Sequence, residues 1–208
     1  MIEPKQHLLD IRRPLPKPEP SRHGLARLDK NERNMVFSDE FMERLRLRVT
    51  SDLLSAYPEP WPIYERLSRL LGCSVDHLAL NAGSEQSIKQ VFETYIRPGD
   101  RVLLHLPGFA MYPVYAEMFQ AEVDSIHCDS NLNFDWQDFI DRITPGLRMV
   151  VVENPNGFLG TAPDLRIIER IVERAAECNA LALVDEAYHL FYSESAERLA
   201  NHFSNVII

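Results

Sequence analysis

Two carboxylates and an aromatic residue directly follow a short apolar run in the segment ALALVDEAYHLFY, residues 180–192. Such a run is typical of a strand buried on both faces of a parallel sheet, and we expect residues 181–184 to form one. Ligands of open α/β sheets bind just beyond the carboxyl ends of the strands, which makes Asp185, Glu186 and Tyr188 candidate site residues. A solvated acidic turn after a strand is the alternative.

A second candidate site lies in the segment NAGSEQSIK, where Gly83 and Ser84 precede apolar residues at helical spacing. With the apolar residues 77–80 before it, this segment predicts a strand, a tight glycine turn and a helix. The free N–H groups at the amino end of that helix could bind an anion such as a phosphate. The alternative is an ordinary helix start at which Ser84 caps the helix.

Two further apolar segments, residues 102–106 and 149–152, are followed by turns with unusual residues, PGFAMY and ENPNGFLG. Phe109 in the first turn could lie flat on a planar ligand, or it could close the core. The second turn cannot continue a sheet, and its amides, including Asn156, lie at the strand end. Four strand ends with such residues favour a binding site over isolated solvated turns.

The elements that must position these residues alternate between strand and helix, which predicts βαβ units and a mainly parallel sheet. Residues 1–36 are expected to form an extended arm, since PLPKPEP carries four prolines in seven residues. Tyr57 and Trp61 are expected in a proline-interrupted loop. Further helices are predicted at residues 39–50, 63–71 (closed by Gly72), 111–120, 136–143, 164–178 and 195–202, and further strands at 123–126 and 206–208.

Composition narrows the class of protein. The 208 residues are 45% hydrophobic, enough for the core of one or two globular domains. A net charge of -9 argues against a nucleic-acid partner, and no apolar run is long enough to span a membrane or act as a signal peptide, so we expect a cytoplasmic protein. Cys73, Cys128 and Cys178 lack the spacing of a disulfide framework or a zinc site.

The order of the segments LDKNE, AYPEP, NAGSEQ, LPGFAMY, ENPNGFLG and VDEAYHLF resembles the class I/II, or fold-type I, pyridoxal-phosphate aminotransferases, especially the histidinol-phosphate aminotransferase branch. The similarity runs from about Leu28 to the end of the chain. It implies an α/β three-layer sandwich with a mainly parallel sheet, in which residues 37–208 form most of the cofactor-binding large domain. It also implies amino acid or amino acid phosphate substrates, 2-oxo acids and a homodimer.

The resemblance also assigns roles around the ring of pyridoxal 5'-phosphate. Asp185 would face the pyridine nitrogen and keep it protonated, so that the ring can accept electrons from the substrate. Tyr188 would donate a hydrogen bond toward the ring hydroxyl. Phe109 stands where the family usually has the Tyr that stacks on the ring.

The cofactor phosphate is placed by the same resemblance at the glycine turn. It would accept hydrogen bonds from the backbone N–H groups of Gly83, Ser84 and Glu85. Tyr57 would reach this phosphate from the partner subunit of the homodimer.

Two departures from the family pattern stand out. The family's NPNNPTG is NPNGFLG in this chain, so Gly157 replaces the Asn that contacts the ring hydroxyl, and Asn156 is a possible substitute. The Schiff-base lysine of the family follows a strand like NVII, so it is expected beyond Ile208, as is the C-terminal small domain. Neither Lys30 nor Lys89 is placed to stand in, and no catalytic residue is assigned within the 208 residues, which alone are expected to be inactive.

Three alternatives remain beside an aminotransferase represented by its N-terminal portion. The same motifs occur in pyridoxal-phosphate lyases and decarboxylases, because one cofactor chemistry can end in several outcomes. A truncated, non-catalytic remnant or interaction module is the second. A metal enzyme using Asp185, Glu186 and His189 is the third, but these residues lack the H-E-x-x-H arrangement, and we assign no metal ligand.

Overall fold

The computed structural model describes residues 2–11, 24–28 and 30–208, so the proline-rich part of the predicted arm, residues 14–20, lies outside the described residues. Contacts divide the chain into two compact units. Unit 1 comprises residues 1–13 and 79–208, and unit 2 comprises residues 14–78. The boundary expected after residue 36 lies within unit 2.

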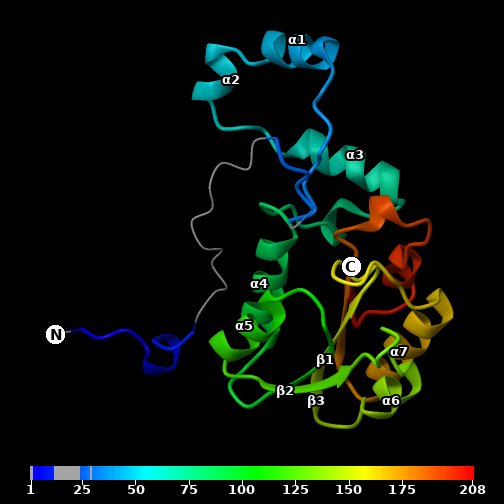
Figure 1. Cartoon of the computed structure of the whole chain (residues 1–208). Coiled ribbons are helices and arrows are strands. Elements are labelled where there is room, and N and C mark those ends of the chain that lie inside the picture. The colour runs from blue at the N-terminus through cyan, green and yellow to red at the C-terminus, as the bar shows by residue number, and fades with distance from the viewer. Residues whose placement is uncertain (1, 12–23, 29) are drawn as a thin grey trace. The chain divides into compact units, whose positions relative to one another are not determined.

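A parallel sheet forms the centre of unit 1 (Figure 1). Among the described residues it has five strands in the order β2-β1-β3-β4-β5, and each neighbouring pair is parallel. The strand order reverses between β1 and β3, because the chain goes outward from β1 to β2 and then returns to the other side of β1. The strands are β1 (Arg101–Leu106), β2 (Glu122–His127), β3 (Leu147–Glu153), β4 (Leu181–Asp185) and β5 (Val206–Ile207).

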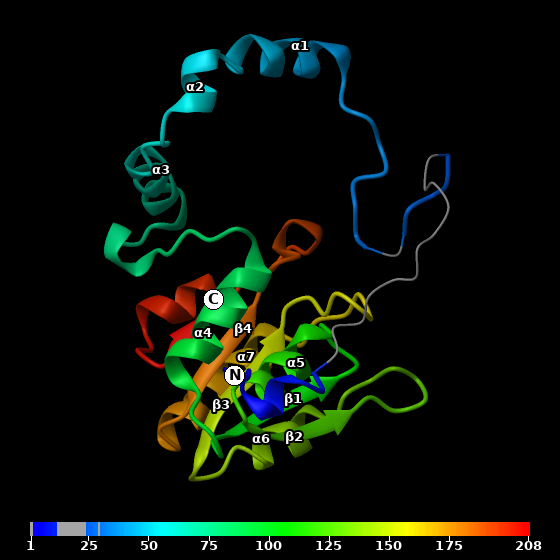
Figure 2. The same ribbon diagram turned by 90° about the vertical axis from the view of Figure 1, so that its left-hand side faces the viewer.

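Helices cover both faces of this sheet and bury its apolar side chains (Figure 2). Helices α4 (Ser84–Tyr95) and α5 (Met111–Met118) pack on the face that carries Met149 and Val151 of β3. Helices α6 (Trp136–Asp141) and α7 (Leu165–Glu177) pack on the opposite face. The predicted three-layer α/β sandwich with a parallel sheet is therefore confirmed.

Unit 2 contains three α-helices in its described part: α1 (Asp39–Arg48), α2 (Ser51–Ser55) and α3 (Trp61–Leu71). Ser38 caps α1 by accepting a hydrogen bond from the Phe41 N–H, and Gly72 ends α3 with a φ of 63°. Trp61 belongs to α3 rather than to the predicted loop, because Pro62 is tolerated in the first turn of a helix.

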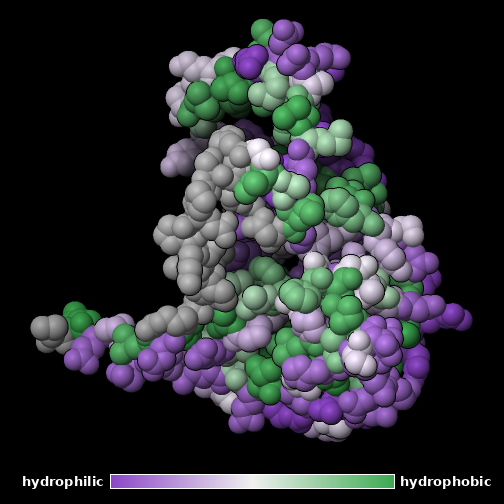
Figure 3. Space-filling view, in the orientation of Figure 1, coloured by the Kyte–Doolittle hydropathy of each residue, from purple (hydrophilic) through white to green (hydrophobic). Residues whose placement is uncertain are grey.

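No residue of these three described helices is buried. Figure 3 shows apolar side chains on the surface over α1 and α2. The exposed apolar residues of these two helices include Phe41, Leu45 and Leu54.

The prediction of a strand at residues 77–80 is wrong. Residues Val75–His77 form a 3-10 helix, and residues 78–80 belong to no strand of the described sheet. The predicted helix at residues 195–202 is a 3-10 helix, Glu197–Asn201. The helix predicted to end at Gln120 ends at Met118, because Gln120 adopts a φ of 58° that an α-helix cannot contain.

Four short 3-10 helices among the described residues join or flank these elements: Gln6–Leu8, Val75–His77, His189–Phe191 and Glu197–Asn201. Across residues 2–11, 24–28 and 30–208, no helix combines the length and apolar character that crossing a membrane requires.

Candidate active site

Asp185 ends β4 beside the end of β3, since it is the register partner of Glu153. Its Oδ2 accepts a hydrogen bond of 2.6 Å from the Tyr112 hydroxyl, and its Oδ1 accepts one of 3.0 Å from the Ala187 N–H. Burial and the negative charge of Asp185 hold the pKa of Tyr112 well above its usual value. Tyr112 therefore remains a hydrogen-bond donor that fixes the orientation of the Asp185 carboxylate.

Glu153 is a second carboxyl group at this edge, and its side chain is buried, with 4% exposure. Oε1 accepts a hydrogen bond of 2.7 Å from the Phe109 N–H, and Oε2 accepts one of 3.2 Å from the Gly157 N–H. Burial raises the pKa of Glu153 to about 7; the two N–H groups oppose this rise, and the charge of Asp185 adds to it. Glu153 therefore changes its charge near neutral pH.

His105 supports the end of β3 from the neighbouring strand. Its Nε2 accepts a 3.0 Å hydrogen bond from the Glu153 N–H, and its ring lies edge-on to Phe134 and Trp136 at centroid distances of 4.9 and 5.4 Å. Burial lowers the pKa of His105 to about 4. His105 is thus a neutral core residue rather than an acid or base.

Gly157, which replaces the family's Asn, lies directly against the ring of Tyr188. A Cβ atom at position 157 would overlap that ring, so the tyrosine occupies the space next to the missing side chain. The turn that carries Gly157 is held by Asn156, whose Nδ2 donates to the Pro107 carbonyl. Asn156 Oδ1 accepts from the N–H groups of Phe158 and Leu159.

These contacts use both polar atoms of Asn156 within the protein. The role suggested for Asn156, replacing the family's Asn at the ring hydroxyl, stays a prediction. The contacts show what it does in this chain: it joins the turn after β3 to the turn after β1.

The glycine turn begins α4 as predicted, but its cap differs from the expected alternative. Gly83, with a φ of 85°, is the capping residue, and no side chain caps this helix end. The turn is held from within α4, because Gln86 Oε1 accepts from the Ala82 N–H. In Figure 2 the amino end of α4 and the segment after β4 lie at the same, upper end of the sheet.

Phe109 follows β1 and packs edge-on to Tyr112, with ring centroids 5.9 Å apart. Phe109, Tyr112 and Asp185 are thereby connected through direct contacts. Tyr57 is 98% exposed and belongs to unit 2; the contact expected for it is with a partner subunit.

Glu186 bonds to a different set of residues from Asp185. Its carboxylate accepts hydrogen bonds from the Asn154 side chain, the Ser195 hydroxyl and the Ala196 N–H, at 2.8, 2.6 and 2.7 Å. His189 Nδ1 lies 4.0 Å from Glu186 Oε2. Within the described part of the chain, no three His, Cys, Asp or Glu residues are grouped so that they could hold a metal ion.

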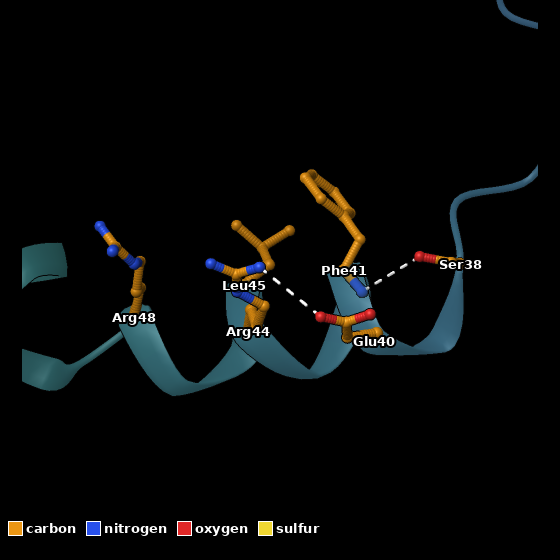
Figure 4. A pocket seen from close by; sticks show the side chains of 6 residues that line it. All are labelled: Ser38, Glu40, Phe41, Arg44, Leu45 and Arg48. Atoms are coloured by element: carbon orange, nitrogen blue, oxygen red, sulfur yellow. Dashed lines mark hydrogen bonds and ion pairs between the residues drawn. The ribbon is translucent and has the colours of Figure 1, made fainter.

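A surface hollow also runs along α1 in unit 2 (Figure 4). It contains no candidate site residue; Arg44 pairs with Glu40 at 3.6 Å, and Ser38 accepts a hydrogen bond from the Phe41 N–H. The lining residues are Ser38, Glu40, Phe41, Arg44, Leu45 and Arg48.

Sequence reasoning missed the roles of Tyr112 and Glu153. A signal existed for Glu153, because it ends an apolar strand just as Asp185 does on the next strand. Tyr112 could be found only through the fold, since it lies 73 residues from the carboxylate that it contacts.

Replacing Glu153 by Gln is expected to change how stability depends on pH. Because the pKa of Glu153 rises from 4.5 to about 7 on folding, its stabilising contribution is complete below the lower value and is lost as pH rises through the higher one. The loss amounts to about 3 kcal/mol. We subtract the free energy of unfolding of Glu153→Gln from that of the parent. This difference should therefore decrease as the pH is raised from about 4.5 to about 8.

Urea unfolding of both proteins across this range measures the difference. The contribution of His105 to stability also changes with pH. Because its pKa is lowered from 6.5 to about 4 on folding, this contribution is complete above pH 6.5 and is lost as pH falls through about 4. Both proteins contain His105, so its contribution cancels in the subtraction. A difference that stays constant with pH would contradict the raised pKa of Glu153.

Comparison with known proteins supplies the family. The aminotransferase class I and II family matches residues 64–207. The histidinol-phosphate aminotransferase of Thermoanaerobacter pseudethanolicus is 28% identical over 187 residues, which cover 88% of this chain and 52% of that protein. The chain thus spans about half the length of the curated relatives it matches.

Solved structures agree on the fold. An alanine aminotransferase from Pyrococcus furiosus superposes with a TM-score of 0.56 at 24% identity, covering 64% of this chain and 35% of that one. A methionine aminotransferase from Escherichia coli superposes with a TM-score of 0.60 at 18% identity, covering 69% of this chain and 40% of that one. With the family match extending over most of the sequence, the chain belongs to the class I and II aminotransferases.

Proposed function

We propose that this chain carries the cofactor-binding part of a pyridoxal-phosphate-dependent aminotransferase that resembles the histidinol-phosphate aminotransferases and acts on amino acids or amino acid phosphates. The observation that carries the proposal is the placement of Asp185 at the end of a buried parallel strand, oriented by the Tyr112 hydroxyl. The similarity of the chain to histidinol-phosphate aminotransferases supports amino acids or amino acid phosphates as the substrate class.

The residues present fit this cofactor. An ionised carboxylate offers about four acceptor positions. Asp185 uses one for Tyr112 and one for Ala187, so it can accept a further hydrogen bond from a protonated ring nitrogen. The N–H groups that begin α4 lack intrahelical acceptors, as at any helix start, and suit a phosphate.

When bound, pyridoxal phosphate supplies a ring that accepts electrons from the substrate. Asp185 would hold a proton at the ring nitrogen. Phe109 would cover one ring face and exclude water from it. Tyr188, held against Gly157, would donate toward the ring hydroxyl and compensate for the family's missing Asn.

Asp185→Asn, made in the longest protein that contains this chain, should retain the cofactor and lose turnover by a factor of about 10² or more. The reason is that a neutral amide cannot hold the ring nitrogen protonated. Steady-state amino transfer and the absorbance of bound cofactor measure the two effects. Asp124→Asn, at a partly exposed carboxylate paired with Arg142, is the control and should stay near parental turnover. Turnover of Asp185→Asn within a few-fold of the parent would rule the role out.

The 208 residues by themselves should not form the covalent cofactor link of the family. The family pattern places the lysine that forms this link after β5. The four lysines of the chain all precede β5: Lys5, Lys17, Lys30 and Lys89. Lys89 is exposed on α4, beyond the glycine turn.

Incubation with pyridoxal phosphate, borohydride reduction and mass analysis of tryptic peptides tests this expectation. Scattered, substoichiometric labelling of lysines is the expected result, without amino-group transfer. Stoichiometric labelling of one lysine together with amino transfer would show that another residue has taken the role.

A further inference from the structure

Glu153 is a buried carboxyl group to which the proposed function assigns no role. It ends β3, and β3 is the neighbour of β1 at the point where the strand order reverses. From this point the chain leaves β1 toward α5 on one face of the sheet and leaves β3 toward α7 on the other. The turns after β1 and β3 therefore diverge, and crevices between such turns bind the ligands of open α/β sheets.

The Glu153 carboxylate joins these two diverging turns. One oxygen binds the N–H of Phe109 in the turn after β1, and the other binds the N–H of Gly157 in the turn after β3. Phe109 is 44 residues away in sequence. Above the pKa of Glu153, which is about 7, both bonds join an ionised acceptor to backbone donors, a type stronger than a neutral pair.

The turn after β1 is shaped around this carboxylate. Gly108 lies so close to Glu153 that a Cβ atom at position 108 would overlap Oε1, and it would also lie 3.0 Å from the His105 carbonyl oxygen. Only a residue without a side chain lets the Phe109 N–H reach the carboxylate. Gly108 and Glu153 thus form a matched pair.

We infer that Glu153 is a positioning residue of the cofactor site, which fixes the Phe109 ring and the Gly157–Tyr188 contact relative to Asp185 by binding both turns at once. The inference rests on the proposed function, since it presumes that the cofactor ring lies between these groups. A carboxylate suits the task because it has two acceptor oxygens. A carboxamide would keep one acceptor and turn an NH2 group toward the other N–H.

The test compares the parent chain with Glu153→Gln, which keeps the shape of the side chain. Asp100→Asn is the matched control, because Asp100 Oδ2 also binds a backbone N–H, that of Arg97, but at the amino end of β1. The probe is pyridoxamine 5'-phosphate, which has the ring and the phosphate but no aldehyde to react with lysines. Binding is followed by the induced circular dichroism of the ring, and inorganic phosphate serves as a second probe.

Glu153→Gln should weaken pyridoxamine 5'-phosphate binding about tenfold, the expected effect of losing one hydrogen bond to a charged group. The affinity for inorganic phosphate should change by less than about twofold, because the α4 turn is untouched. Hydrogen exchange measured by mass spectrometry should accelerate in peptides covering residues 107–112 or 154–160 and not in residues 147–152. Asp100→Asn should leave binding of both probes and exchange in these peptides unchanged.

Two results would overturn the positioning role: parental affinity of Glu153→Gln for pyridoxamine 5'-phosphate, or equal weakening for both probes, which indicates a general loss of structure. A parent chain that binds no pyridoxamine 5'-phosphate would be different. It would overturn the proposed function, and the positioning role with it.

Discussion

The common direction of the strands is the constraint on which the rest of the structure depends. Because each neighbouring pair in the described sheet is parallel, the turns that follow β1, β3 and β4 meet at one edge. Polar groups brought there are partly buried and need partners. Tyr112 meets this need for Asp185, and the two turn N–H groups meet it for Glu153. The candidate site is therefore a consequence of sheet topology combined with hydrogen-bond satisfaction.

The same edge places two carboxyl groups on adjacent strands, and their environments differ. Glu153 is buried beneath the turns and has a raised pKa, whereas Asp185 lies at the margin, partly exposed and oriented by a tyrosine. We interpret the first as an internal support for the backbone and the second as the group that faces a ligand. His105 completes the support by accepting the N–H of Glu153.

The sequence predicted the parallel sheet and the helices of unit 1 because the spacing of apolar residues follows burial. Continuous apolar runs mark strands buried on two faces, and apolar residues at helical spacing mark helices buried on one face. It failed at residues 77–80, because an apolar segment does not reveal whether a neighbouring strand exists to pair with it. It did not identify Tyr112 or Glu153, since their roles depend on which strands are neighbours. The contact between Gly157 and Tyr188 was likewise hidden, although the unusual Gly157 marked the position.

A structure of the chain soaked with pyridoxamine 5'-phosphate tests the central claim most directly, that the strand-end groups form one cofactor site. The account predicts the ring nitrogen within hydrogen-bond distance of Asp185, the phosphate on the N–H groups of residues 83–85, and the Phe109 ring over one face of the cofactor. Density for the ring at any other place, or a ring nitrogen that faces away from Asp185, would contradict it.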